Sequence, residues 1–309
     1  MRRIDWILMV AVFAISIGLR MFTSDSPPSD NAPYENPRRP SPEKFTPKRE
    51  TAGLWARETE SWPTIRPRRG RNEIPASAGL PREGTIQEDG KTGASSGTAF
   101  SVSGDGYWLT ARHVVEGCAK TGIQTRQRGV VRVQRVILHP RADVAMLVTK
   151  GAPNPLPVAD VAGGRLRTRD AFNIGFPAGQ PGAVHARYMG QMTLRHSGRR
   201  LRGGGYRERV NAWSEQSRAP ERSGSLGGLS GGAVLDGAGR VIGVVQAESR
   251  RRGRVMTATP NTLRELFELA KFTPPLNAVE SAGLAVNTYP AAARDLILSR
   301  RVAKVICRT

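Results

Sequence analysis

The sequence predicts an all-β protein built from antiparallel strands, arranged as a sandwich or a barrel. Between residues 92 and 259, short apolar runs alternate with turns that contain glycine, proline or Asp-Gly. The run Val131–Val136 alternates apolar and polar residues with the period of two that a half-buried strand shows. The long helical patterns that a parallel sheet requires between its strands do not occur in this region. Many short strands at this spacing are typical of antiparallel architectures.

Two segments precede the β-rich region. Residues 1–22 carry Arg2 and Arg3 and then an uncharged run from Trp6 to Leu19, which fits a signal peptide or a membrane anchor. We therefore expect an N-terminal hydrophobic helix, which is either cleaved as a signal peptide or kept as a membrane anchor. Residues 23–91 are rich in proline and arginine and show no helical or alternating period. Such a segment is predicted to be a disordered linker, because it cannot bury enough apolar surface to offset its ordering entropy.

The C-terminal part of the chain is predicted to be helical. A helix is expected to begin at Thr259-Pro260-Asn261 and to end before Pro274-Pro275. We take residues 92–275 as one domain on this basis. Residues 276–309 are expected to form an extension, with a second amphipathic helix from Pro290 to Ile306.

Three segments carry the residue types that serine-based acyl transfer needs. His113 follows a predicted hairpin, Asp143 opens an apolar strand, and Ser230 stands in Gly-Leu-Ser-Gly-Gly just before another hairpin. This chemistry requires a hydroxyl, an imidazole that takes its proton, and a buried carboxylate that orients the imidazole. Glycines around the serine leave backbone N–H groups free, so we take the amides of Gly228 and Ser230 as a candidate oxyanion hole.

The chain order His, Asp, Ser separates folds that share this chemistry. The segment Gly228–Gly232 also matches the G-x-S-x-G elbow of α/β-hydrolases, a fold that places its histidine after the serine. All four histidines precede Ser230, so that interpretation fails. A subtilisin order needs an aspartate before the histidine on a parallel framework. Asp89 and Asp105 are available, but the helices of such a framework are missing from the pattern.

The catalytic segments resemble the signature blocks of chymotrypsin-fold (trypsin-like) serine proteases, and most closely the bacterial Deg/HtrA branch. The blocks are Thr110–Val115, His139–Leu147 and Gly228–Gly232, and Asn173–Pro177 resembles the segment that opens the second barrel. The resemblance implies two antiparallel six-stranded β-barrels with a C-terminal helix. It also implies a serine endopeptidase that needs no cofactor or metal, with a polypeptide as substrate.

Carried over by position, the resemblance makes His113 the general base, Asp143 its orienting carboxylate and Ser230 the nucleophile. Leu229 stands where members activated by cleavage carry an aspartate, so activation by a new N-terminus is not expected. The segment after the domain is too short for the PDZ domain of full Deg/HtrA proteins. Gln246, Ala247 and Glu248 match the substrate-binding edge strand. Glu248 falls near the primary specificity pocket, but a solvated glutamate at a strand end is the simpler interpretation.

Cysteine content and charge indicate the compartment and the partners. Cys118 and Cys307 can form a disulfide in an oxidising compartment, with two unpaired thiols as the alternative. The net charge is +21, with arginines concentrated in residues 195–209 and 250–254. Contact with an anionic membrane surface is the functional interpretation, and a solvated arginine-rich surface is the simpler one. Aromatic residues are scarce, at 6%, and form no stacking platform, so no nucleic acid is expected.

We therefore expect an exported serine endopeptidase of the periplasm or cell envelope. It would be anchored to the inner membrane by its N-terminal helix, or secreted after signal cleavage. No zinc-ligand spacing, P-loop or dinucleotide motif occurs in the sequence, which predicts no cofactor. Two alternatives stay open: a catalytically silent binding module on the protease fold, and an esterase that uses the same triad.

Overall fold

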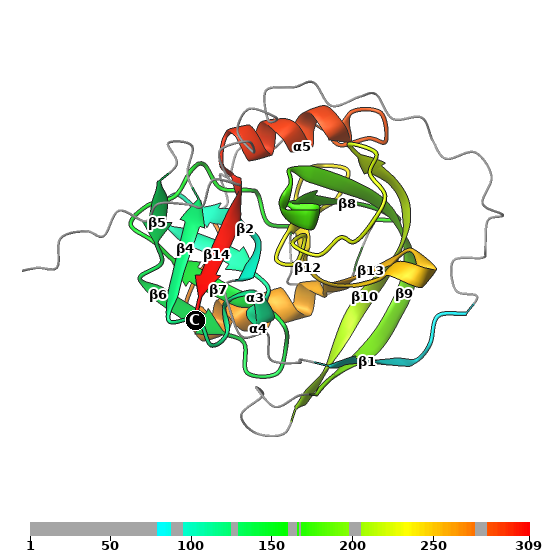
Figure 1. Cartoon of the computed structure of the whole chain (residues 1–309), viewed down its shortest axis with the longest axis horizontal. Coiled ribbons are helices and arrows are strands. Elements are labelled where there is room, and N and C mark those ends of the chain that lie inside the picture. Colours follow the sequence, from blue (N-terminus) through cyan, green and yellow to red (C-terminus); the bar gives the residue numbers. More distant parts are fainter. Residues whose placement is uncertain are drawn as a thin grey trace, which may run out of the picture. The chain divides into compact units, whose positions relative to one another are not determined.

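The computed structural model describes residues 79–87, 95–124, 129–159, 166, 168–197, 205–275 and 283–309. All of them belong to one compact unit, Lys44–Thr309. The predicted N-terminal helix and residues 23–78 of the predicted linker lie outside the described residues. Within the described ranges, no helix is long and apolar enough to cross a membrane. Most described elements are strands in two sheets (Figure 1), which confirms the predicted all-β class.

The first sheet carries the segments around His113 and Asp143. Its strand order is β5-β4-β14-β2-β3-β7-β6, and it forms a half-barrel that does not close on itself among the described residues. The bounds are β2 Ser95–Ser103, β3 Tyr107–Thr110, β4 Lys120–Gln124, β5 Val130–Arg132, β6 Arg135–Leu138, β7 Ala145–Val148 and β14 Val302–Arg308. All neighbouring strands in this sheet run antiparallel.

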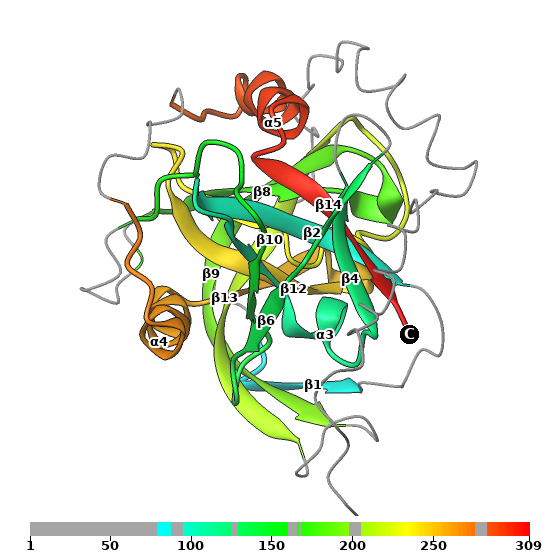
Figure 2. The same cartoon turned by 90° about the vertical axis from the view of Figure 1, so that its left-hand side faces the viewer.

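The second sheet is a closed barrel of six strands, because β8 pairs with both β9 and β11. The strands are β8 Asp170–Gly175, β9 Gly182–Ser197, β10 Tyr206–Ala219, β11 Ala233–Leu235, β12 Val241–Ser249 and β13 Arg254–Ala258. A further strand, β1 Glu83–Gln87, pairs in parallel with the end of β9 (Figure 2). The chymotrypsin-like fold class is thereby confirmed, with the first sheet as a half-barrel rather than a closed one.

The two sheets share one hydrophobic core. Phe100 and Leu109 from the first sheet lie in the same cluster as Phe172 and Leu235 from the second. Each of the four side chains is at most 2% exposed. Full burial of such a side chain contributes about 1.5–3 kcal/mol to folding. The sheets are therefore fixed against each other by buried apolar surface, which matters because the candidate catalytic residues come from both.

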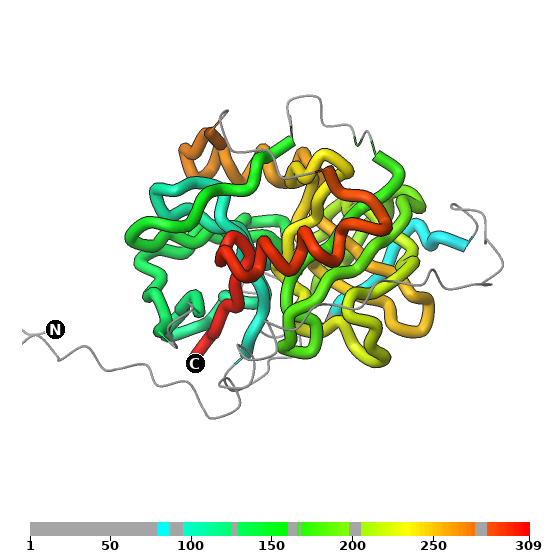
Figure 3. The backbone as a smooth tube through the Cα atoms, turned by 90° about the horizontal axis from the view of Figure 1, so that it is seen from above, coloured from blue at the N-terminus to red at the C-terminus, as the bar shows by residue number. Residues whose placement is uncertain are grey.

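The predicted helix after Thr259 is confirmed as α4, Pro260–Ala270. The Thr259 side chain accepts a hydrogen bond from the backbone N–H of Thr262, and Pro260 occupies the first turn. The apolar face buries Leu263, Leu266 and Phe267 in the shared core. A second helix, α5 Tyr289–Leu298, packs against β8 and β9 and leads to the C-terminal strand (Figure 3).

Two segments differ from the sequence-based expectation. The amphipathic helix expected to reach Ile306 ends at Leu298, and residues 302–308 form strand β14 between β2 and β4. The expected extension 276–309 thus supplies an interior strand of the first sheet. Strand β1 lies inside the expected linker 23–91. In both cases pairing with a distant strand decides the structure, and local periodicity carries no information about that pairing.

Candidate active site

His113 is presented by a single helical turn, α3 Arg112–Val115, that follows β3 directly. The next two residues, Val114 and Val115, are buried in the core of the first sheet. They anchor the turn and leave the His113 side chain 29% exposed. The histidine is therefore held in place by its apolar neighbours while its ring stays accessible from outside.

Asp143 contacts His113 with both of its carboxylate oxygens. The His113 backbone N–H donates to Oδ1 at 2.8 Å, and the ring Nδ1 lies 2.6 Å from Oδ2. The Asp143 side chain is only 1% exposed. A buried carboxylate at this distance holds the proton on Nδ1 and leaves Nε2 as the basic atom of the ring. The pair has the geometry that a general base and its orienting group require.

Ser230 lies in a turn of the second barrel that is hydrogen-bonded to strand β2 of the first sheet. The Thr98 N–H donates to the Ser230 carbonyl oxygen at 2.9 Å, and the Thr98 hydroxyl donates to the Gly228 carbonyl oxygen at 2.7 Å. The following residue, Gly231, has φ +84°, and a Cβ there would lie 2.1 Å from the Thr98 carbonyl oxygen. A glycine after the serine is therefore required for the turn to approach β2 this closely.

Gly97 connects the serine turn with the histidine helix. A Cβ at this position would lie 2.6 Å from a methyl carbon of Val114 and 3.0 Å from the Ser230 carbonyl oxygen. Both segments thus pack against the same glycine, from opposite barrels. The structure therefore brings the three predicted residues His113, Asp143 and Ser230 into one region.

The two predicted oxyanion donors, the backbone amides of Gly228 and Ser230, are not used in backbone hydrogen bonds among the described residues. Gly228 has φ +94°, a conformation that L side chains rarely adopt, and a Cβ there would lie 2.6 Å from the Phe176 carbonyl oxygen. Since the turn also fixes the Gly228 carbonyl to Thr98, these two amides can be held ready for a negatively charged oxygen.

The three residues of the predicted substrate-binding strand have different surroundings. Gln246 is buried, and its amide donates to the Asp143 carbonyl oxygen at 3.3 Å. Glu248 accepts hydrogen bonds from the Ser225 hydroxyl and, at 2.8 Å, from the Leu226 N–H. Glu248 therefore holds the loop at Ser225 and Leu226, which leads to the turn at Gly228. Ala247 is partly exposed on β12.

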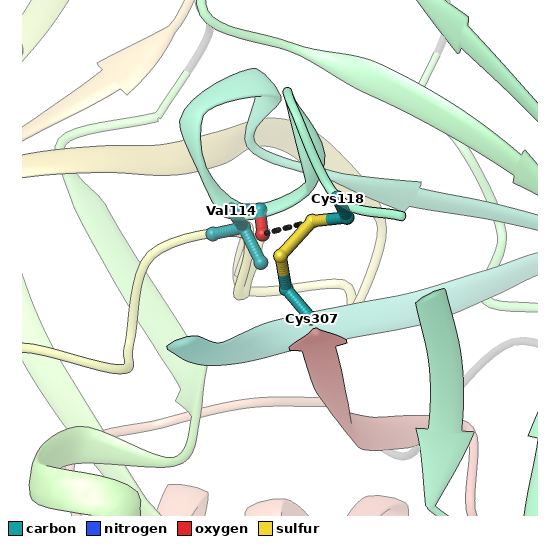
Figure 4. Close-up of a disulfide and its surroundings, with 3 residues drawn as sticks. All are labelled: Val114, Cys118 and Cys307. Atoms are coloured by element: carbon teal, nitrogen blue, oxygen red, sulfur yellow. Dashed lines mark hydrogen bonds between the residues drawn. A yellow bond between two sulfur atoms is a disulfide. The ribbon is translucent and has the colours of Figure 1, made fainter. Parts of the chain in front are cut away.

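Cys118 and Cys307 form a disulfide with a Cα–Cα distance of 5.4 Å (Figure 4). The bridge ties the end of the α3 turn to strand β14. The Cys118 sulfur also lies 3.6 Å from the Val114 carbonyl oxygen. A bonded sulfur has no proton to donate, so this is a packing contact. The disulfide places a covalent link directly behind the residues that anchor His113.

His139, which precedes the aspartate in the same sequence block, has a separate role. Its Nε2 lies 3.2 Å from a carboxylate oxygen of Glu265 on α4. Burial lowers the pKa of His139, and the nearby Glu265 carboxylate partly opposes that effect. The contact joins the first sheet to the helix.

A pocket of about 680 Å³ opens beside Ala142 and Glu208, and Ser230 is not among its lining residues. The pocket therefore lies next to Glu208, which accepts the backbone N–H of Asp143, and we do not regard it as the substrate site. No group of three or more His, Cys, Asp or Glu side chains in the described ranges is placed to hold a metal ion.

Sequence reasoning did not identify three residues that support the site: Thr98, His196 and Glu208. Thr98 bonds the serine turn, and the other two lie behind Asp143. One signal was available for Glu208. In Arg207-Glu208-Arg209-Val210 the alternation places Glu208 on the same face as Val210, and both are buried between exposed arginines. An acidic residue on the inward face of a strand indicates a specific partner.

Comparison with known proteins gives one family match. Residues 97–244 match the family described as "Trypsin-like peptidase domain", and this range holds His113, Asp143 and Ser230. No curated protein sequence is significantly similar to the chain.

Several solved structures are similar. The active form of the Rv3671c protease from M. tuberculosis is 23% identical, with a TM-score of 0.47, over 59% of this chain and 76% of that one. The HtrA-type protease AlgW with a decapeptide is 24% identical, with a TM-score of 0.42, over 57% of this chain and 51% of that one. The MamO protease domain from Magnetospirillum magneticum is 17% identical, with a TM-score of 0.40, over 59% and 91% respectively.

Proposed function

Because the chain is a serine protease of the chymotrypsin fold with a trypsin-like peptidase domain, we propose that it hydrolyses peptide bonds through an acyl-enzyme formed on Ser230. The observation that carries this mechanism is the contact between His113 and the buried Asp143, with 2.6 Å between Nδ1 and Oδ2. This pairing directs the basic Nε2 of an accessible imidazole away from Asp143. Ser230 is partly exposed and stands in a glycine-bracketed turn, which supports its proposed role as the group that gives its proton to Nε2.

In the first half of the reaction, the Ser230 hydroxyl oxygen attacks the carbonyl carbon of the scissile bond, and its proton passes to His113 Nε2. The carbonyl oxygen becomes negatively charged and accepts hydrogen bonds from the Gly228 and Ser230 amides. His113 then gives its proton to the leaving amine as the C–N bond breaks.

In the second half, water attacks the acyl-enzyme with His113 again as the base, and the C–O bond to Ser230 breaks. His113 then returns the proton of this water to the Ser230 oxygen, which restores the starting enzyme. Removing one oxyanion donor costs about 100- to 1,000-fold in kcat in enzymes of this type.

We also propose that the protein acts outside the cytoplasm, in the periplasm or cell envelope. The disulfide between Cys118 and Cys307 supports an oxidising compartment. The apolar segment within residues 1–22 supports an anchor in the inner membrane or a cleaved signal. Three exposed arginines, Arg250, Arg251 and Arg252, support contact with an anionic membrane surface.

The catalytic proposal is tested by labelling with a fluorophosphonate, which reacts with activated serines, and by hydrolysis of peptides. The wild-type protein is expected to be labelled and to cleave peptides, and Ser230→Ala is expected to do neither. The matched control is Ser223→Ala, which removes an exposed serine of the preceding loop and should leave both activities unchanged. Peptide cleavage by Ser230→Ala at the wild-type rate would overturn the proposal. Turnover of ester substrates without peptide cleavage would indicate an esterase instead.

A further inference from the structure

A second carboxylate, Glu208 on β10, lies directly behind Asp143. The Asp143 backbone N–H donates to Glu208 Oε1 at 3.1 Å. The Gln246 amide donates to Glu208 Oε2 at 3.0 Å and to the Asp143 carbonyl oxygen at 3.3 Å. Glu208 therefore holds Asp143 by its backbone, both directly and through Gln246. Asp143 belongs to the first sheet and both partners to the second, so these contacts cross between the barrels.

His196 on β9 provides the charge partner of Glu208. Its Nε2 lies 2.7 Å from Glu208 Oε1, and neither side chain is more than 3% exposed. The His196 ring stacks on Tyr206, with 4.4 Å between ring centroids and an angle of 13° between planes. On the same Tyr206 ring lies the guanidinium of Arg112, 5.2 Å from its centroid. The stack fixes the plane of the His196 ring and ties it to the residue next to His113.

Two buried carboxylates this close to each other need compensation. Burial raises the pKa of Glu208, the hydrogen bond from His196 lowers it, and the negative charge of Asp143 raises it. His196 Nε2 lies beside Glu208 Oε1, and the Gln246 amide donates a hydrogen bond to Oε2, so each carboxylate oxygen of Glu208 has a buried polar neighbour. A buried carboxylate without such partners would cost several kcal/mol, so this arrangement indicates a role that outweighs its desolvation.

We propose that Glu208, held by His196 and Gln246, is a positioning residue that fixes the catalytic carboxylate Asp143 against His113. The proposal rests on the proposed function, because Asp143 matters only if His113 acts as the base. Both Asp143 side-chain oxygens are used on His113, so the position of this residue depends on its backbone, and Glu208 is the side chain that accepts its N–H.

The expected consequence of losing Glu208 is a fall in kcat rather than a rise in KM. Without the acceptor, the Asp143 N–H is buried and unsatisfied, and the loop can shift away from His113. A misplacement of about 1 Å in a catalytic group can cost about 100-fold in rate. Substrate binding is expected to change little, because Glu208 is buried and contacts Asp143 at its backbone N–H.

Two substitutions at this position grade the effect. Glu208→Gln keeps an oxygen that can accept the Asp143 N–H, and Glu208→Ala removes it. We expect kcat for peptide hydrolysis to fall less than about 10-fold in the first and roughly 10- to 100-fold in the second, with KM within about twofold of wild type in both. Thermal unfolding of each variant shows how much of the protein is folded in the assay.

A matched pair of histidines separates positioning from stability. His196 and His185 both lie on β9, both are buried, and each contacts a carboxylate, Glu208 or Asp170. His196→Gln should lower kcat, and His185→Gln should not, even where both lower the melting temperature. The low-field proton resonance of the His113–Asp143 hydrogen bond gives a second readout. It should shift in Glu208→Gln and His196→Gln and stay unchanged in His185→Gln.

The proposal is overturned if Glu208→Ala retains kcat within about twofold of wild type, since misplacement of Asp143 must slow the chemical step. It is also overturned if His185→Gln lowers kcat and shifts the resonance as much as His196→Gln. An equal loss in Glu208→Gln and Glu208→Ala would contradict the role of the acceptor oxygen. Failure of the proposed function is distinguishable, because Ser230→Ala would then be as active as wild type.

Discussion

The disulfide between Cys118 and Cys307 is expected to be a major source of stability. It links residues separated by 189 positions, so it restricts most of the described chain in the unfolded state. The chain-entropy relation gives about 5 kcal/mol for a loop of this length, and removal of native disulfides typically costs about 2–5 kcal/mol. Replacing both cysteines by alanine should therefore lower the free energy of unfolding by about 2–5 kcal/mol. For a domain of this size the melting temperature should fall by roughly 5–15 °C.

The position of the bridge also predicts where the protein opens first. Cys307 is the next-to-last residue of β14, and its partner lies at the end of the α3 turn. Without the bridge, the C-terminal end of β14 loses its covalent link to the α3 turn and can separate from β2 and β4. Amide hydrogen exchange in β14 should accelerate more than in β10, which lies in the closed barrel.

Urea unfolding followed by tryptophan fluorescence measures the change, because Trp108 and Trp213 are both buried. Wild-type protein kept under reducing conditions should unfold at the same urea concentration as the double alanine variant, and the variant itself should not respond to reductant. A variant that unfolds within about 0.5 kcal/mol of the oxidised wild type would refute the reasoning, because the entropic restriction would then be absent.

Three further predictions concern the site and the core. Thr98→Val removes the hydroxyl that bonds the Gly228 carbonyl oxygen, so kcat should fall about 10-fold, the equivalent of about 1.4 kcal/mol; an unchanged kcat in steady-state peptide hydrolysis would contradict this. Leu263→Ala on α4 deletes a fully buried side chain and should cost about 2–5 kcal/mol in urea unfolding; a loss below about 1 kcal/mol would show that the core collapses around the gap. Burial raises the pKa of Tyr289 to about 12. The phenol ionises in the unfolded chain at about pH 10, so the free energy of unfolding should fall between about pH 10 and 12. Tyr289→Phe should lack this part of the loss. Equal pH dependence of the two proteins would contradict the prediction.

The local structure around His113, Asp143 and Ser230 could be predicted from sequence because its signals are local. The glycines around Ser230 allow the turn that lies against Thr98, and the apolar residues after His113 and Asp143 anchor each segment. The start of α4 was also predictable, since Thr259 is a typical N-cap residue and Pro260 is favoured in the first turn of a helix. Each of these features depends on residues within a few positions of one another.

The parts that could not be predicted depend on distant pairing. Strand β14 reads as the continuation of an amphipathic helix, and only its place between β2 and β4 decides otherwise. Glu208 and His196 stand in an arginine-rich stretch that resembles a solvated loop, although both are buried. Glu208 contacts Asp143 and His196 contacts Glu208, and nothing in the local sequence of either residue indicates these partners.

Some of the contacts that sequence could not reveal join the two barrels, and the proposed chemistry depends on these. His113 and Asp143 belong to the first sheet and Ser230 to the second barrel, so the triad forms only if the two are in register. A shared core fixes the barrels coarsely, because apolar packing has little directional preference. The hydrogen bonds of Thr98 to the serine turn, and of Asp143 to Glu208, fix them directionally. Substitutions at these crossing contacts should therefore reduce kcat at a smaller loss of stability than substitutions in the core.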